Sequence, residues 1–157
     1  MYEFPQVSPD RSGFEALMVL REGRRNDVYL DSKGKPTVGI GHLVLLADSL
    51  SIGDWISDAQ IDAFFAEDSD AAWKAAIQEA MLAGINSSAF LPFLASVNFQ
   101  LGTKWTSSWP HTWQMIRQGH YEMAAAALDG TPWQNETPAR VADFQAALRA
   151  LPPLLSV

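Results

Sequence analysis

The feature that most constrains the fold is a long Ala-rich stretch that runs from Asp58 to about Leu82. It begins at Ser57-Asp58-Ala59-Gln60, where a Ser at the cap position is followed three residues later by Gln, the pattern of a capping box. Apolar side chains then recur at broadly helical spacing, at positions 61, 64, 65, 72, 75 and 76. A helix of about 25 residues spans roughly 37 Å. We therefore expect one long helix that connects two lobes of a mainly helical domain.

Upstream of this helix, the sequence from Arg21 to Leu43 predicts a helix end followed by a β-hairpin. Glu22 is followed at once by Gly23, a residue preferred just past the end of a helix. Strand-forming residues then flank a polar turn, with strands expected at 28–30 and 37–40 and the turn at 31–34. Glu22 at the helix end and Asp31 in the turn are thus expected to face a common cleft.

The two carboxyl groups suit the two roles that glycoside hydrolysis requires, although each taken singly also suits a surface charge or an ordinary turn residue. A general acid needs an apolar setting that keeps it protonated near neutral pH, and Glu22 follows an apolar helix face. Asp31 lies in a polar turn, which suits a partner that stays ionised. An inverting enzyme leaves about 6.5–9.5 Å between its carboxyl groups for a water molecule, and the Thr37 hydroxyl is a candidate to orient that water.

The stretch as a whole resembles the catalytic segment of the phage T4-type lysozymes. Asp31 follows Glu22 after eight residues, Thr37 follows after five more, and Gly39-Ile40-Gly41-His42-Leu43 closes the motif. The resemblance implies that Glu22 is the general acid. It also implies that Asp31 and Thr37 hold and activate the attacking water, and that the glycosidic bond is cleaved with inversion.

A second segment, Trp133-Gln134-Asn135-Glu136-Thr137-Pro138-Ala139-Arg140, resembles another signature of the same family. It implies that Arg140 meets the catalytic Glu22, the alternative being an Arg on the helix surface. Asp68 stands where the family has an Asp that pairs with His42. A metal site at His42 is disfavoured because the other two His residues show no ligand spacing with it, so neither metal nor cofactor is expected.

The resemblance further implies four substrate contacts: Leu43, Phe99, Gln100 and Thr112. Of these, Phe99 also suits a core position. Three tryptophans in the second half are expected mainly in the core, with stacking on sugars as the alternative: Trp105, Trp109 and Trp113. The link between the GIGHL run and the long helix is about a dozen residues shorter than in the best-known member, which predicts a trimmed small lobe.

We expect an α+β, mainly α, two-lobed lysozyme-like domain that occupies residues 1–157 without a separate wall-binding domain. The small hairpin lobe covers about 23–57, and the helical lobe covers about 70–157 plus a helix at 10–22. Further helices are predicted at 87–101, 113–118, 120–128 and 138–151, the last capped by Thr137. Residues 1–8 are expected to form a loosely packed arm.

Charge and composition exclude several classes of function. A net charge of −7 argues against nucleic-acid binding, which requires basic patches. Cysteine is absent, so no thiolate site exists, and folding in a reducing compartment is expected. No apolar run is long enough for a membrane span, and the N-terminus does not resemble a signal peptide.

These observations, together with the resemblance, predict a muramidase that cleaves the β-1,4 bond between N-acetylmuramic acid and N-acetylglucosamine in peptidoglycan glycan strands. The expected context is a phage endolysin, made as a monomer in the host cytoplasm and released to the periplasm by a holin or other delivery machinery. A tail-associated lysozyme or a secreted antibacterial effector suits the acidic charge better. The remaining alternatives are a lytic transglycosylase, which needs a single Glu, and a catalytically idle wall-binding module.

Overall fold

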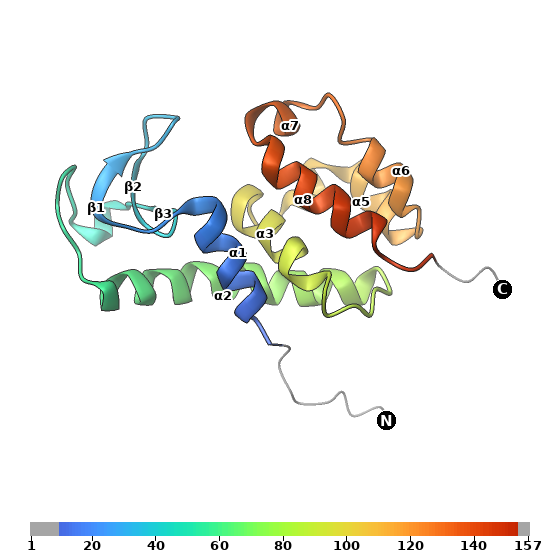
Figure 1. Cartoon of the computed structure of the whole chain (residues 1–157), viewed down its shortest axis with the longest axis horizontal. Coiled ribbons are helices and arrows are strands. Elements are labelled where there is room, and N and C mark those ends of the chain that lie inside the picture. The colour runs from blue at the N-terminus through green and yellow to red at the C-terminus, as the bar shows by residue number, and fades with distance from the viewer. Residues whose placement is uncertain (1–9, 154–157) are drawn as a thin grey trace.

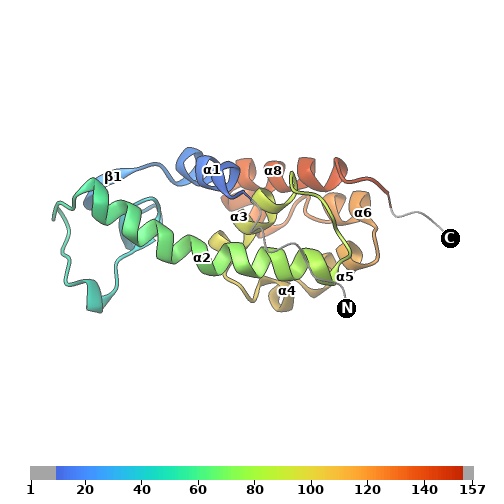
Figure 2. The same cartoon turned by 90° about the horizontal axis from the view of Figure 1, so that it is seen from below.

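The computed structural model describes residues 10–153, which form a small β-containing lobe and a helical lobe along one long helix (Figure 1). This helix, α2 (Asp58–Leu82), is 25 residues long and runs beneath both lobes, as Figure 2 shows from below. The structure is mostly helical with one three-stranded antiparallel sheet. The predicted α+β, mainly α fold class is confirmed. Within residues 10–153 no helix combines the length and apolar character needed to cross a membrane.

Helix α2 begins where the sequence predicts, because the Ser57 hydroxyl accepts a hydrogen bond from the backbone N–H of Gln60 at 3.1 Å. Its apolar face is buried along its whole length, so one helix contributes to the core of both lobes. At the small-lobe end Ile61 packs so closely on the sheet that a Cβ added to Gly39 would lie 3.2 Å from it. Just past the middle of α2, Trp73 stacks on Phe14 of the first helix, with ring centroids 5.7 Å apart.

The sheet has the order β1 (Arg25–Leu30), β2 (Pro36–Gly39) and β3 (His42–Leu43), all antiparallel. Its register sets Tyr29 opposite Thr37 and Thr37 opposite Leu43. Residues directly opposite each other project from the same face of a sheet. The other face carries Val28 and Val38, both fully buried against the core.

The link between the sheet and α2 also pairs with β1. The N–H of Val28 donates to the Asp54 carbonyl at 2.8 Å, and the N–H of Ile56 donates to the Asn26 carbonyl at 2.7 Å. These bonds form an isolated antiparallel bridge between Asp27 and Trp55. The link therefore covers the outer edge of β1.

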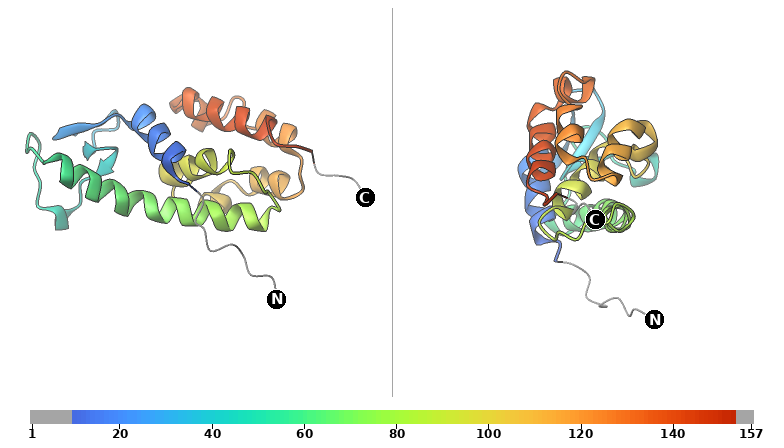
Figure 3. Two further views of the ribbon diagram at one scale, coloured as in Figure 1. Left: turned by 60° about the horizontal axis from the view of Figure 1, so that its bottom comes forward. Right: turned by 90° about the vertical axis from the view of Figure 1, so that its right-hand side faces the viewer.

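The helical lobe packs seven further helices around α2 in the part of the chain that the structure describes. Figure 3 shows the first of these, α1, lying between the sheet and α8. The bounds are α1 (Ser12–Glu22), α3 (Leu91–Leu101), α4 (Trp105–Ser108), α5 (Pro110–Arg117), α6 (Tyr121–Ala126), α7 (Pro132–Glu136) and α8 (Pro138–Arg149), and a short 3-10 helix, η1 (Leu46–Asp48), lies in the small lobe.

Several helix boundaries differ from the expectation, and α4 and α7 were not predicted. Helix α3 begins at Leu91 because Ser87 first forms a turn, in which its hydroxyl accepts the N–H of Phe90 at 3.3 Å. Thr137 is the N-cap residue of α8, as predicted, but its side chain makes no capping hydrogen bond. The Thr137 hydroxyl instead donates to the Trp133 carbonyl of the preceding helix, α7, at 3.2 Å. The expected N-terminal arm lies outside the described residues.

One carboxyl group, that of Glu79 on α2, is buried in the helical lobe and is only 6% exposed. Its Oε1 accepts hydrogen bonds from Asn98 Nδ2 at 2.7 Å and from Trp105 Nε1 at 3.1 Å. Both donors are neutral. Burial raises the pKa of Glu79, and the two hydrogen bonds offset this only in part.

We predict that Glu79→Gln gains stability over the unmodified chain as the pH rises. A group with a raised folded-state pKa contributes stability below its unfolded value, near 4.5, and loses it as the pH rises through the folded value. Gln keeps an acceptor for both donors without this loss, so the gain should reach the order of 1 kcal/mol. Denaturant unfolding between pH 4 and 8, with the exposed Glu67→Gln as the control, measures it. A pH-independent difference would contradict the interpretation.

Candidate active site

The site is centred on Glu22, the last residue of α1, whose side chain lies against the backbone of the sheet. A Cβ added to Gly41 would lie 2.7 Å from Glu22 Oε2, and Gly41 adopts a φ of +64°, a conformation that L side chains rarely adopt. The glycine between Ile40 and His42 is therefore required for two reasons. It permits the turn, and it leaves room for the carboxyl group.

Arg140, near the start of α8, holds the Glu22 carboxyl from the other side through an ion pair between its Nη1 and Oε1 of Glu22. The Arg140 side chain is 9% exposed and that of Glu22 is 24% exposed. Nη2 of Arg140 donates to the Ser96 carbonyl at 3.3 Å and to the Ser96 hydroxyl at 3.2 Å, which fixes the guanidinium on α3. The predicted meeting of Arg140 and Glu22 is thus present, and Ser96 is a support that the sequence did not indicate.

A second arginine secures the same helix end. Arg21 makes a bidentate ion pair with Asp143 on α8, at 2.7 Å from Nε and 2.8 Å from Nη2. Bidentate Arg–carboxylate pairs fix orientation as well as distance. The last turn of α1 is therefore tied to α8 at two consecutive residues.

Asp31 lies in the hairpin turn that follows β1, and the turn backbone orients its carboxylate. Oδ1 accepts hydrogen bonds from the N–H groups of Lys33 at 2.9 Å and Lys35 at 2.8 Å. Thr37, on the adjoining strand, is 6% exposed and donates its hydroxyl hydrogen to the Lys35 carbonyl at 3.0 Å. Its oxygen keeps lone pairs that can accept a hydrogen bond.

Tyr29 on β1 lies close to both groups in the chain. It is opposite Thr37 in the sheet, and Asp31 follows it by two residues. Burial raises the pKa of Tyr29, and the charges of Glu22 and Asp31 raise it further. By its register Tyr29 lies beside Thr37 on the sheet, one residue before the end of the strand that leads to Asp31. Strand alternation alone would have identified Tyr29 as a member of the site.

His42 bridges two carboxylates. Nδ1 lies 2.7 Å from Asp68 Oδ2 on α2, the predicted partner, and Nε2 lies 2.9 Å from Asp48 Oδ2 in η1. The ring also stacks on Phe64, with centroids 3.9 Å apart. Burial alone would lower the pKa of His42, but hydrogen bonds and charges from Asp68 and Asp48 outweigh it and raise the pKa. Within residues 10–153 no cluster of three or more His, Asp or Glu side chains is arranged to hold a metal ion.

The four predicted substrate contacts lie in different settings. Leu43 and Phe99 line a hollow of about 290 Å³ beside Gly41. Gln100 uses both ends of its amide internally, since Nε2 donates to the Thr137 hydroxyl and Oε1 accepts from Trp133 Nε1, each at 2.9 Å. Thr112 is 5% exposed on α5 and does not line that hollow. Of the four residues, the lining of this hollow therefore includes Leu43 and Phe99.

The three tryptophans that the sequence singled out, Trp105, Trp109 and Trp113, contribute to packing. Trp105 is buried, and its ring meets those of Trp113 and Phe144 edge-on, with centroids 5.8 and 6.0 Å away. Trp109 packs against Trp133 at 5.8 Å. Trp55, by contrast, is exposed and pairs with Asp27 at the edge of the sheet. The sequence did not single it out.

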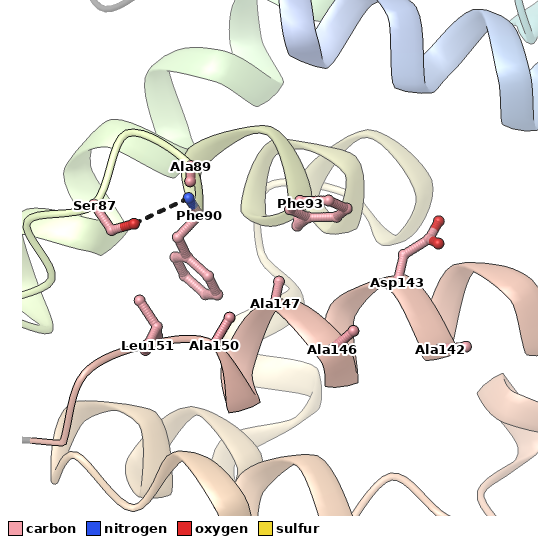
Figure 4. Close-up of a pocket in the computed structure, with 10 residues that line it drawn as sticks. All are labelled: Ser87, Ala89, Phe90, Phe93, Ala142, Asp143, Ala146, Ala147, Ala150 and Leu151. Carbon is pink, nitrogen blue, oxygen red and sulfur yellow. Dashed lines mark hydrogen bonds between the residues drawn. The ribbon is translucent and has the colours of Figure 1, made fainter.

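A larger hollow of about 450 Å³ lies away from these carboxyl groups, between the start of α3 and α8 (Figure 4). Alanine side chains of α8 face Phe90 and Phe93 across it, so the space results from small residues on one wall. The acid on its rim, Asp143, is held by Arg21. The lining therefore offers an apolar surface without a free acid–base pair.

A small antiparallel sheet and a helical lobe that share one long helix, with a glutamate held at their junction, define a lysozyme-like domain. The chain belongs to the phage lysozyme family, whose model matches residues 20–145, and the predicted family is confirmed. A relative is the peptidoglycan hydrolase gp36 of Pseudomonas phage phiKMV, which is 29% identical over 123 residues and 78% of this chain. The chain spans 14% of the length of that relative.

We predict that Gly41→Ala destabilises the fold more than Gly34→Ala does. Both positions have positive φ, +64° and +75°, but no atom of the described residues lies within 4 Å of a Cβ at Gly34. Gly34→Ala should cost about 1–2 kcal/mol for its conformation alone. Gly41→Ala should cost roughly 1 kcal/mol or more beyond that, since the methyl group displaces Glu22. Equal free energies of unfolding in denaturant would show that the carboxyl group does not lie against Gly41.

We also predict that the cost of His42→Gln depends on pH. Because the folded-state pKa of His42 is raised, its contribution is fully present below the unfolded value, near 6.5, and is lost as the pH rises through the folded value. The pKa of Asp48 is lowered, first by the N–H of Leu45 and then by His42, so its contribution is lost only in acid. The difference in Tm should therefore be largest near pH 5–6 and shrink toward pH 9. His111→Gln, at an exposed position, should show no such trend.

Proposed function

We propose that the chain is a muramidase that hydrolyses the β-1,4 bond between N-acetylmuramic acid and N-acetylglucosamine in peptidoglycan glycan strands. The observation that carries the proposal is the position of Glu22, held between Gly41 and Arg140 at the junction of the two lobes, beside a hairpin whose turn orients Asp31. Membership of the phage lysozyme family and similarity to a phage peptidoglycan hydrolase support the same substrate.

In the proposed mechanism Glu22 donates a proton to the glycosidic oxygen as the bond to the anomeric carbon breaks. A water molecule attacks that carbon from the opposite face, which inverts its configuration. Asp31 accepts the proton of the water, and Thr37, whose hydroxyl oxygen can accept a hydrogen bond, orients it. Leu43 and Phe99 contact the sugar rings through the hollow that they line.

Arg140 has a positioning role in this scheme. A guanidinium beside a carboxyl group favours the ionised form, which opposes the requirement that Glu22 be protonated before transfer. Its contribution is therefore geometric. With its other amino group fixed on Ser96, it keeps the carboxyl directed toward the cleft rather than free to rotate.

For the biological context we propose a phage endolysin that acts in the host periplasm as a monomer, after release by a holin or other delivery machinery. The second candidate is a lysozyme domain carried by a larger phage component, such as a tail. Its support is that the chain matches 14% of a much longer phage protein. The net charge of −7 also favours delivery by an attached component over adhesion to an anionic wall.

The reaction is tested by digesting purified Gram-negative peptidoglycan and measuring the mass of the released fragments. Fragments that end in reducing N-acetylmuramic acid would support the muramidase. Anhydro ends would assign a lytic transglycosylase instead. If a folded sample releases no peptidoglycan fragments, a wall-binding role is favoured.

We predict that Glu22→Gln lowers the rate of release by about 100- to 10,000-fold, the usual contribution of a general acid. The variant should also melt at a lower temperature, because Arg140 is largely buried and loses its charged partner. Glu15→Gln is the matched control on the same helix, since Glu15 is half exposed and, within residues 10–153, pairs with Arg11 at 3.8 Å.

Asp31→Asn is the companion variant. The Asn carbonyl oxygen can still accept the two N–H groups of the turn, so the hairpin should remain intact while the base is lost. A comparable fall in rate with an unchanged Tm is expected. Full activity in either Glu22→Gln or Asp31→Asn would contradict the assigned roles.

A further inference from the structure

A row of polar and aromatic side chains continues beyond the catalytic residues on the outer face of the small sheet. Arg25 donates to Asp27 from Nε at 3.1 Å and from Nη2 at 2.7 Å. The same guanidinium lies over the ring of Tyr29, 4.1 Å from its centroid. These contacts show that the side chains of alternate β1 residues, Arg25, Asp27 and Tyr29, lie on one face.

Trp55 extends this row on the neighbouring edge segment. It lies opposite Asp27 in an antiparallel bridge whose hydrogen bonds are made by the flanking residues, 54 to 28 and 56 to 26. In such a non-hydrogen-bonded pair the two side chains are closest and project from the same face. The Trp55 ring is 70% exposed, so it stands on the row with most of its surface open to solvent.

At its other end the row joins the proposed catalytic groups. Tyr29 lies opposite Thr37, and Thr37 lies opposite Leu43, which lines the hollow beside Gly41. Asp31 follows Tyr29 by two residues, in the turn that continues β1. The register of β1 against β2 shifts between Arg25 and Tyr29, yet the Arg25 guanidinium lies over the Tyr29 ring across this irregularity. One sheet face therefore leads from Trp55 to the residues proposed to activate water.

The chemistry of the outer end suits an uncharged sugar ring. An exposed indole provides a flat apolar surface together with an N–H donor. The Arg25–Asp27 pair is neutral as a unit yet offers both donors and acceptors, which match hydroxyl and N-acetyl groups. A nucleic acid is a poor occupant, because the face has no net positive charge and the chain as a whole is acidic.

We propose that the outer face of the small sheet, formed by Trp55, Arg25, Asp27 and Tyr29, is an additional glycan subsite. It binds a sugar of the strand remote from the bond that is cleaved. Trp55 provides the stacking surface and the Arg25–Asp27 pair provides hydrogen bonds. The proposal rests on the proposed function of the cleft, because the same strand occupies both.

The subsite is tested first by binding, in the inactive Glu22→Gln background so that no strand is cleaved. The probes are peptide-free glycan strands from Gram-negative peptidoglycan, compared with short fragments that fill the cleft alone. Trp55→Ala should weaken binding of the long strands about tenfold and leave that of the short fragments unchanged. Trp55→Phe should retain most of the affinity, because it keeps an aromatic surface.

The control is Leu46→Ala, which removes a fully exposed apolar side chain from the same lobe, outside the row and the hollow. In the active enzyme, Trp55→Ala should raise KM for long strands with little change in kcat. Equal long-strand affinities of Trp55→Ala and Leu46→Ala would overturn the subsite. Failure of the proposed function is a separate result, in which the unmodified chain releases no fragments while the binding comparison still decides the subsite.

Discussion

The structure depends on one ion pair, that between Glu22 and Arg140, which brings together segments 118 positions apart in the sequence. Glu22 ends α1, Arg140 lies on α8, and Gly41, in the turn between β2 and β3, closes the third side. Each of these elements ends, begins or turns here for a local reason. Helix α1 ends at Gly23, α8 begins at Pro138, and the positive φ of Gly41 permits the turn. The junction between the lobes is consequently also the place where a carboxyl group is held in one orientation, and stability and chemistry share the same contact.

The long helix α2 explains how two lobes with small cores form one domain. Its sheet-side residue Ile61 and its helical-lobe residue Trp73 are both buried, so neither lobe has to bury its apolar surface alone. His42 adds a polar connection at the sheet end, where Asp68 of α2 meets the motif that carries Gly41. The backbone beside Glu22 is thereby fixed on the side that Arg140 does not reach.

The sequence was sufficient for the fold class, the long helix and the family, since helix periodicity, a Ser cap and a spaced motif are local signals. Tertiary contacts between residues that carry no local signal were harder to predict. Ser96 and Asp48 gave no periodic or motif signal, because each serves by its position relative to Arg140 or His42. Thr137 occupies the expected N-cap position of α8 but makes no capping hydrogen bond for a related reason, because its hydroxyl donates to the Trp133 carbonyl of the preceding turn.

The short link between the sheet and α2 determines which side chains lie beside the outer edge of β1. With few residues to span the gap, the chain runs along β1 and pairs with it, which sets Trp55 opposite Asp27. The same link turns through η1 and delivers Asp48 to His42. A longer loop would satisfy its backbone groups in its own turns and would have no need to pair with the sheet. Because the link is short, it runs along the edge of the sheet. Trp55 is thereby placed on the same face as Tyr29, whose strand leads to Asp31 and pairs with Thr37.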